Sequence, residues 1–287
     1  MNNSHKRFGM VLAGGGVRGM AHVGVLHAFN RMGFFPDALV GVSMGAIIAA
    51  TYSLNPNWYR DLCQMDTSCF PEPARPLSAD WRERVRALLA SEKMVREMFL
   101  GWGAGEQSQQ DGKALLTEMT LGQNLEQGRI PVATVAMDLV SGQRVVFDQG
   151  DAMTATYASA ALPGLLPPLR MGNQLLADGT YIDDAPVDVV KSLAKSHKLD
   201  VVIAVNVGQL KLDRSINNGF QAMLRAVEIC HHAHSSARFM QADAIISVEF
   251  PRQINVLAFE CKRLCIAAGI KSVRSQSQQL RRLLSFD

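Results

Sequence analysis

Short apolar runs alternate with amphipathic stretches over the first fifty residues of the chain. Residues 8–13 (FGMVLA) and 38–42 (ALVGV) are continuous apolar runs, which are typical of buried strands. Residues 20–32 carry apolar side chains at helical spacing and end at a glycine, and residues 44–54 form an alanine-rich helical pattern. Two strand–turn–helix units in succession predict a parallel sheet with helices packed on its faces.

The same alternation returns after residue 130. We expect helices over 152–161 and about 219–240, and strands over 130–138, 143–147, 174–177, 201–207 and 245–248. A basic helical segment at about 252–287 closes the chain. These elements extend the α/β pattern of the first fifty residues, and we assign residues 1–287 to a single domain.

Residues 55–110 interrupt this rhythm. They begin with Asn55-Pro56 and contain further prolines, then a helical pattern over 81–102, and then a stretch rich in Gly, Gln and Ser. Regular structure is expected to resume at Asp111. We interpret the segment as a helical insertion packed over the sheet edge. The alternative is a lid or a lipid-facing surface, since an amphipathic helix can also lie in a membrane interface.

The composition narrows the class of protein. Hydrophobic residues make up 48% of the 287 residues and charged residues 19%, which is typical of a globular chain. A net charge of +3 gives no indication of a nucleic-acid partner. Neither a signal peptide nor an apolar run of membrane-spanning length is present, so we expect a cytoplasmic protein. The five cysteines lack CxxC spacing and are interpreted as free buried thiols.

Basic residues gather near the end of the chain. A solvated helix face is the simpler interpretation of this run, and transient contact with anionic headgroups at the inner membrane surface is the alternative. The run consists of Lys262, Arg263, Lys271, Arg274, Arg281 and Arg282.

A glycine-flanked serine lies where the second predicted strand gives way to a helix. Residues Gly41 to Gly45 (GVSMG) fit the pattern G-x-S-x-G. A serine on such a sharp turn has its hydroxyl exposed, and the small flanking residues let backbones pass closely. The following helix directs its free amides, notably that of Met44, toward a developing oxyanion. Ser43 is therefore the predicted nucleophile, and a capping serine in a structural turn is the alternative.

The glycine-rich loop at 14–19 (GGGVRG) follows the first predicted strand and opens the first helix. It matches the dinucleotide-binding pattern G-x-G-x-x-G, but Asp37 precedes the second strand instead of closing it. No Gly-Lys-Ser/Thr follows the glycines, which excludes a P-loop. The same amides can instead bind the oxyanion of a tetrahedral intermediate. Arg18 suits a loop-fixing role, a phosphate contact or a solvated surface position.

Two kinds of base are open to Ser43. The order Ser, acid, His of α/β hydrolases is satisfied by Ser43, Asp178 and a histidine from a helical stretch, namely His231, His232 or His234. A loop after a strand is the expected place for that histidine, which counts against all three. The other base is Asp178 itself, because a strand end followed by Gly179 places its carboxylate on the face where the other motifs lie.

Together these motifs resemble the patatin-like phospholipases. The resemblance rests on GGGVRG at 14–19, continuing as MAHVGVL, on GVSMG at 41–45 and on the Asp-Gly pair at 178–179. Further similar stretches are PVATVAMDLVSGQRVVF at 131–147, SAALPGLLPP at 159–168 and LADGTYIDDAPV within 175–187. The likeness extends from Phe8 to about Gly208, and the joint order of the motifs is more specific than any one of them.

The resemblance implies an α/β fold, a three-layer α/β/α arrangement with a mostly parallel central sheet. It also implies a Ser43–Asp178 dyad without a catalytic histidine, and an oxyanion hole centred on the amides of Gly15, Gly16 and Val17. The wider candidate set for that hole is Gly14, Gly15, Gly16, Val17, Arg18, Gly19 and Met44, and the supporting glycines are Gly41, Gly45 and Gly179.

The implied activity is esterase, phospholipase A or lysophospholipase chemistry on a lipid or acyl-ester substrate, with neither cofactor nor metal. One departure from the family pattern is Thr180, which stands where Gly or Ala usually follows the Asp-Gly pair. The competing classes are a nucleotide-binding protein that uses the glycine loop and a non-catalytic lipid-binding or scaffold protein.

Overall fold

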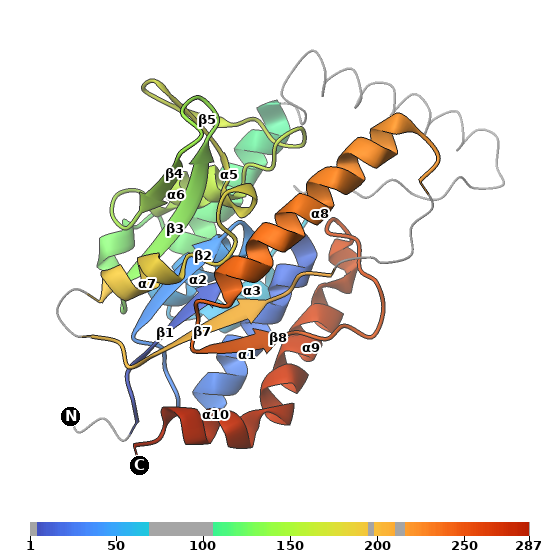
Figure 1. The fold of residues 1–287 in the computed structure, drawn as a ribbon. Coiled ribbons are helices and arrows are strands. Elements are labelled where there is room, and N and C mark those ends of the chain that lie inside the picture. The colour runs from blue at the N-terminus through green and yellow to red at the C-terminus, as the bar shows by residue number, and fades with distance from the viewer. Residues whose placement is uncertain (1–4, 69–105, 195–197, 210–215, 287) are drawn as a thin grey trace.

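A central sheet organises the molecule. The computed structural model describes residues 5–68, 106–194, 198–209 and 216–286. Within these ranges the strands form one eight-stranded sheet in the order β5-β6-β3-β2-β1-β7-β8, with β4 also paired to β3 (Figure 1). The parallel strands are β1 (Phe8–Leu12), β2 (Ala38–Val42), β3 (Val132–Asp138), β7 (Val201–Asn206) and β8 (Ala244–Ser247). The antiparallel additions are β4 (Arg144–Phe147), β5 (Leu169–Met171) and β6 (Gln174–Asp178).

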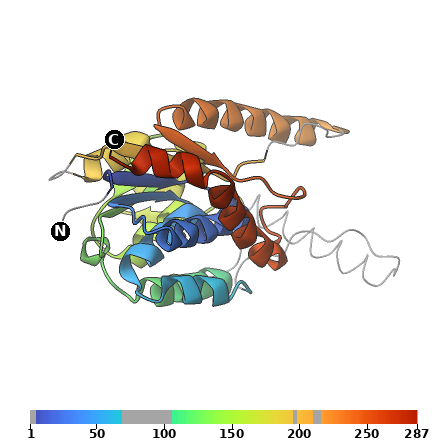
Figure 2. The same ribbon diagram turned by 90° about the horizontal axis from the view of Figure 1, so that it is seen from below.

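Helices cover both faces of the sheet (Figure 2). One face packs against α1 (Ala21–Arg31), α2 (Met44–Leu54), α3 (Trp58–Gln64), α5 (Glu106–Thr120), α6 (Ala152–Ala160) and α9 (Lys262–Ser275). The other face carries α7 (Val187–Leu193) and α8 (Gly219–Phe239), and α10 (Ser277–Leu284) ends the chain. This is the expected three-layer arrangement with a mostly parallel sheet.

The alternation along β1 explains the two cores. Phe8, Met10 and Leu12 belong to the cluster under α1 and α2, whereas Val11 belongs to the cluster under α7. Because successive side chains of a strand point to opposite faces, a continuous apolar run is what a strand buried on both faces requires. The apolar runs of the sequence therefore became the central strands.

Most predicted elements are present, and the differences have local causes. β2 and α2 have the predicted bounds, but β5 was not expected, since three residues carry too little periodicity. Helix α5 begins at Glu106, ahead of the expected Asp111. The 252–287 segment is irregular up to residue 258 before η4 (Phe259–Cys261), α9 and α10. The predicted helix at 81–102 lies outside the described residues, and the single-domain assignment and the role of 55–110 stay predictions.

The C-terminal basic side chains mostly face solvent. Arg263, Lys271 and Arg274 on α9 and Arg281 and Arg282 on α10 are exposed, which agrees with a solvated helix face. Among the described residues, no helix is both long enough and apolar enough to cross a bilayer.

The described cysteines are free thiols in different environments. Cys261 and Cys265 are buried, and burial raises the pKa of the Cys265 thiol to about 12. Cys63 is half-buried, and Cys230 lies exposed on α8. The expectation of buried thiols is therefore wrong for Cys230, because that residue lies on the solvent side of its helix.

Candidate active site

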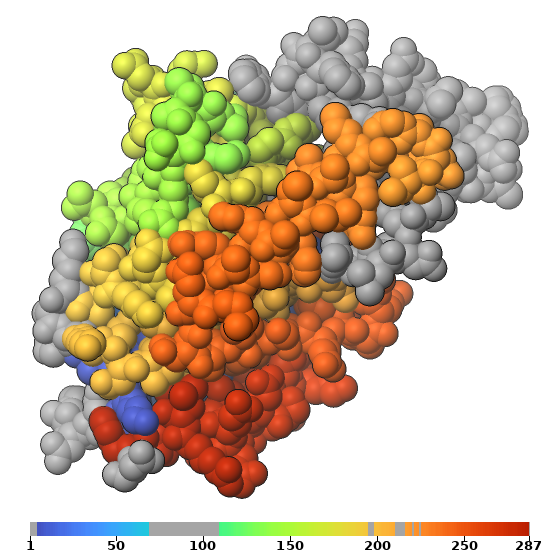
Figure 3. Space-filling model, in the orientation of Figure 1, coloured from blue at the N-terminus to red at the C-terminus, as the bar shows by residue number. Residues whose placement is uncertain are grey.

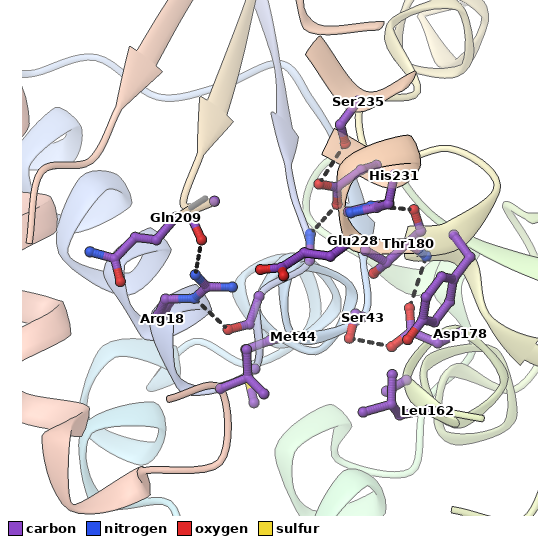
Figure 4. Close-up of a pocket in the computed structure, with 18 of the residues that line it drawn as sticks. Arg18, Ser43, Met44, Leu162, Asp178, Thr180, Gln209, Glu228, His231 and Ser235 are labelled. Atoms are coloured by element: carbon purple, nitrogen blue, oxygen red, sulfur yellow. Dashed lines mark hydrogen bonds between the residues drawn. The ribbon is translucent and has the colours of Figure 1, made fainter. Parts of the chain in front are cut away.

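Two strand ends meet beside β3. Val42 of β2 pairs with Val135, and Asp178 of β6 pairs with Ala136, the next residue of β3. Because β2 runs parallel to β3 and β6 antiparallel, the two ends approach this point from opposite directions. Ser43, directly after β2, donates a hydrogen bond from Oγ to Oδ2 of Asp178 at 2.6 Å (Figure 4).

The turn at Ser43 is strained and closely packed. Ser43 has φ 54° and ψ −124°, a left-handed conformation that a residue with a side chain rarely adopts. Its amide donates to Oγ of Ser159 at 3.0 Å. A Cβ at Gly41 would lie 2.2 Å from the carbonyl oxygen of Gly45, and a Cβ at Gly45 would lie 2.1 Å from that of Leu12. The elbow therefore requires glycine on both sides of the serine.

Asp178 is buried at the end of β6. Burial raises the pKa of its carboxyl, and the hydrogen bonds from Ser43 and Thr180 partly oppose that rise. The backbone amide of Thr180 donates to Oδ1 of Asp178 at 2.9 Å. Because the donor belongs to the backbone, threonine can form this bond as well as the Gly or Ala usual at that position. A Cβ at Gly179 would lie 2.1 Å from the carbonyl oxygen of Val135, which explains the glycine after the aspartate.

The glycine loop adjoins the serine and is anchored from two sides. The amide of Gly14 donates to Oδ1 of Asp184 at 2.6 Å, and the amide of Val17 donates to the carbonyl oxygen of Val256 at 2.8 Å. An amide has one hydrogen, so these two donors are occupied within the protein. This corrects the sequence-based set of oxyanion donors at Gly14 and Val17.

Some of the remaining candidate amides have an acceptor within the protein, and others do not. The Arg18 amide donates to the carbonyl oxygen of Gly15 at 3.2 Å, which also removes it from the set, and Gly19 lies inside the short 3₁₀ helix η1 (Gly16–Met20). The amides of Gly15, Gly16 and Met44 have no acceptor among the bonds found in the described parts of the chain. These three donors are the ones available to an oxyanion.

A cleft of about 270 Å³ opens over Ser43 and Asp178 and is lined by both polar and apolar side chains. Burial lowers the pKa of Arg18, whose guanidinium lies 3.5 Å from the carbonyl oxygens of Gly15 and Gln209. Arg18 is therefore neither a solvated surface residue nor tightly bound by these long contacts. The apolar lining includes Ile47, Leu162, Leu165, Leu166, Leu257 and Phe259, and the polar lining includes Arg18, Gln209, Glu228, His231 and His232.

Two of the three histidines at positions 231–234 of α8 bind backbone carbonyl oxygens near the site. Nε2 of His231 lies 3.0 Å from the carbonyl oxygen of Thr180, and Nε2 of His234 lies 3.0 Å from that of Ile182. His232 lines the cleft. Within the described residues, none of the three forms a hydrogen bond with Ser43, whose hydroxyl donates to Asp178.

Asp37 does not lie where a ribose-binding carboxylate is expected. Oδ2 of Asp37 accepts a hydrogen bond from the amide of Phe8 at 2.9 Å, at the start of β1 and away from the glycine loop at its other end. An acidic residue that binds a ribose would lie beside the loop. No cluster of three or more His, Cys, Asp or Glu side chains in the described ranges is arranged to hold a metal ion.

Three supporting residues were not singled out from the sequence. Ser159 bridges the amide of Ser43 and the carbonyl oxygen of Val135, to which its hydroxyl donates at 2.6 Å. Asp184 accepts from Gly14 and, through Oδ2, from Ser235 of α8 at 3.1 Å. Asp184 lies in a stretch that carries the family resemblance, but its role depends on contacts distant in the chain.

The chain matches a known family over the segment that contains this site. A family model described as patatin-like phospholipase matches residues 10–191. The chain belongs to the patatin-like phospholipase family. The matched range of this patatin-like protein includes the glycine loop, Ser43 and Asp178, and it ends before α8 begins at Gly219.

Curated relatives are longer than this patatin-like chain. It is 29% identical over 194 residues to an uncharacterized NTE family protein of Mycobacterium tuberculosis, with 64% of this chain and 28% of the relative covered. It is 29% identical over 203 residues to neuropathy target esterase sws of Drosophila melanogaster, with 70% and 13% covered. The chain thus spans well under a third of the length of these two relatives.

Among solved structures, VipD from Legionella pneumophila is similar with a TM-score of 0.49 and 14% identity, covering 96% of this chain and 67% of that one. A type III effector, ExoU, is similar with a TM-score of 0.36 and 16% identity, covering 96% and 53%.

Proposed function

We propose that this protein is a serine acyl hydrolase that cleaves fatty-acyl esters of lipids or phospholipids through Ser43 and Asp178. The observation that carries the proposal is the 2.6 Å hydrogen bond from the hydroxyl of a strained, glycine-flanked serine to a buried carboxylate. A nucleophile within hydrogen-bond reach of its base is the geometry that acyl transfer requires.

The reaction proceeds in two halves. Oγ of Ser43 attacks the ester carbonyl carbon while its proton passes to Oδ2 of Asp178, and the resulting oxyanion accepts hydrogen bonds from Gly15, Gly16 and Met44. The intermediate collapses, and the leaving alcohol takes the proton from Asp178. Water then attacks the acyl-enzyme and gives a proton to Asp178. The second intermediate collapses to the fatty acid, and the proton returns to Ser43.

Burial addresses the weakness of a carboxylate base. An exposed aspartate has a pKa far below neutral and takes a proton from a hydroxyl poorly. Burial raises the pKa of Asp178, and the cleft holds the Ser43 hydroxyl beside it. The raised pKa of Asp178 and its short distance from Ser43 therefore both favour transfer of the serine proton to the carboxylate.

The substrate class follows from the cleft. Its apolar lining residues suit an acyl chain, and its polar lining residues suit a headgroup or glycerol backbone. The names of two relatives, neuropathy target esterase and patatin-like phospholipase domain-containing protein 7, support an ester or phospholipid substrate. We extend the proposal to a cytoplasmic protein that contacts the inner membrane surface transiently when it takes up substrate.

A fluorophosphonate probe tests the proposal. Wild-type protein is expected to be labelled at Ser43 and to hydrolyse a p-nitrophenyl ester, and Ser43→Ala is expected to lose both properties while keeping its circular dichroism spectrum. Folded wild-type protein that neither reacts with the probe nor hydrolyses the ester would contradict it. Equal labelling of Ser43→Ala would place the nucleophile elsewhere.

A further inference from the structure

Helix α8 lies outside the range that the family model matches, yet it borders the active site. It crosses the front of the molecule in Figure 1 and contributes a continuous ridge to the surface in Figure 3. His231 and Ser235 are four positions apart on this helix, so their side chains share one face of it. That face is turned toward the segment that follows Asp178.

The first contact reaches the base. His231 binds the carbonyl oxygen of Thr180 at 3.0 Å, and the amide of the same Thr180 donates to Oδ1 of Asp178 at 2.9 Å. A single residue therefore connects α8 to the carboxylate, as Figure 4 shows. His234, one turn along, holds the carbonyl oxygen of Ile182 at 3.0 Å and fixes the next part of the same turn.

The second contact reaches the glycine loop. The hydroxyl of Ser235 donates to Oδ2 of Asp184 at 3.1 Å, and Oδ1 of Asp184 accepts from the amide of Gly14 at 2.6 Å. Both Asp184 and Ser235 are buried. The carboxylate thus joins α8 to the loop that carries the proposed oxyanion donors Gly15 and Gly16.

We propose that His231 and Ser235 are positioning residues. Through them α8 holds the turn at residues 179–182, which we call the base turn, and the glycine loop at a fixed separation. The proposal rests on the function proposed above. An oxyanion donor and a base act on the same reacting carbonyl, so their separation must match the transition state, and a shift of about 1 Å can lower the rate about 100-fold.

Charges around Asp184 give this arrangement a measurable signature. Burial raises the pKa of Asp184 to about 7, the hydrogen bonds from Gly14 and Ser235 oppose that rise, and the charges of Asp178 and Asp183 add to it. The charge of Asp184 in turn favours the charged form of Arg18, whose pKa burial lowers. Removing the Ser235 hydroxyl removes a donor to the charged form, so the pKa of Asp184 rises further.

The experiment compares Ser235→Ala with Ser192→Ala in wild-type background. Ser192 lies on α7, where its hydroxyl donates to the carbonyl oxygen of Val189 in its own helix. With a short p-nitrophenyl ester we expect Ser235→Ala to lower kcat about tenfold, to leave KM within about twofold and to move the acid limb of the kcat profile to higher pH. Ser192→Ala is expected to match wild type, and Ser235→Thr, which keeps the hydroxyl, is expected to restore kcat.

Three further variants complete the test. If Ser235→Ala does not fold, Ser235→Cys, a weaker donor of similar size, is compared with Ser235→Thr and is expected to have the lower kcat. His231→Ala is expected to lower kcat about tenfold and His231→Gln to recover part of it.

Other results would contradict either the positioning role or the proposed function. Unchanged kcat and pH profile in Ser235→Ala, or equal kcat in the Cys and Thr variants, would overturn the positioning role. An inactive wild type that the fluorophosphonate probe does not label would instead overturn the proposed function. A loss in His231→Ala as large as that in Asp178→Asn would make the histidine a base and not a positioning residue.

Discussion

Residues 8–193 and residues 198–286 contribute to one site in different ways. The first region supplies the proposed nucleophile and base, Ser43 and Asp178, each at the end of a strand. The second supplies contacts that hold them, from Ser235 on α8 to the carbonyl oxygen of Val256. The reacting groups lie in short local motifs, whereas their supports depend on how distant segments pack.

The two regions also meet on the opposite face of the sheet. Gly24 of α1 and Gly269 of α9 let the helices approach closely, because a Cβ at Gly24 would lie 2.0 Å from the carbonyl oxygen of Ile266 and a Cβ at Gly269 would lie 2.0 Å from that of Ala21. The second region is therefore packed tightly against the first on both faces of the sheet. Substitutions in the two regions should distinguish residues that react from residues that hold them in place.

The largest effect is expected at the base. Asp178→Asn removes the proton acceptor but keeps the shape of the side chain, so kcat for a p-nitrophenyl ester should fall by about 1,000-fold or more. Asp200→Asn is the matched control, since Oδ2 of Asp200 accepts from the amide of Arg7, away from the cleft. A fall of less than about tenfold in Asp178→Asn would break the distinction between reacting and supporting residues.

The next effect concerns stability and pH. The folded protein holds the pKa of Asp184 at about 7, above the ordinary value for aspartate, so folding favours the protonated form and the free energy of unfolding falls as pH rises from about 4 to 7. Asp184→Asn does not titrate at this position. Its stability relative to wild type should therefore be greater at pH 8 than at pH 5, by on the order of 3 kcal/mol.

Urea unfolding at the two pH values measures this difference. Gly14 can still donate to the amide oxygen of the substituted side chain, so the fold is expected to persist. A difference between variant and wild type that stays constant from pH 5 to pH 8 would contradict the assignment.

A smaller effect is expected where α1 and α9 cross. Gly269→Ala forces a methyl group against the backbone of Ala21 and should lower the free energy of unfolding by about 2 kcal/mol. Gly112→Ala is the control, because Gly112 of α5 has open space around it and alanine favours helices by up to about 1 kcal/mol. Thermal unfolding compares the two, and equal midpoints would show that the helices separate readily.

The smallest effect tests the departure at Thr180. Among the described residues its buried hydroxyl oxygen forms no hydrogen bond of normal geometry, although it is close enough to Asp178 to lower the pKa of that carboxyl. Its backbone amide binds Asp178. Thr180→Val keeps the shape and the amide, and should raise the free energy of unfolding by about 1 kcal/mol or less. A marked loss of stability in chemical denaturation would indicate that the hydroxyl has a role in the folded state.

The sequence by itself determined the elements whose causes are local. The apolar run and alternating faces set β1, the glycines around Ser43 set the elbow, and the strand end before Gly179 marked Asp178. Each depends on neighbours within a few residues, since a turn, a strand period and a close backbone approach are local requirements.

The tertiary structure alone decided which groups meet. Gly14 and Asp184 are 170 positions apart, and only the packing of α8 against the base turn decides that this carboxylate takes one loop amide. The same packing places His231 against the carbonyl oxygen of Thr180. A hydrogen bond between distant segments depends on position in space and leaves no period in the sequence, so the sequence indicated the proposed nucleophile but not the residues that hold it.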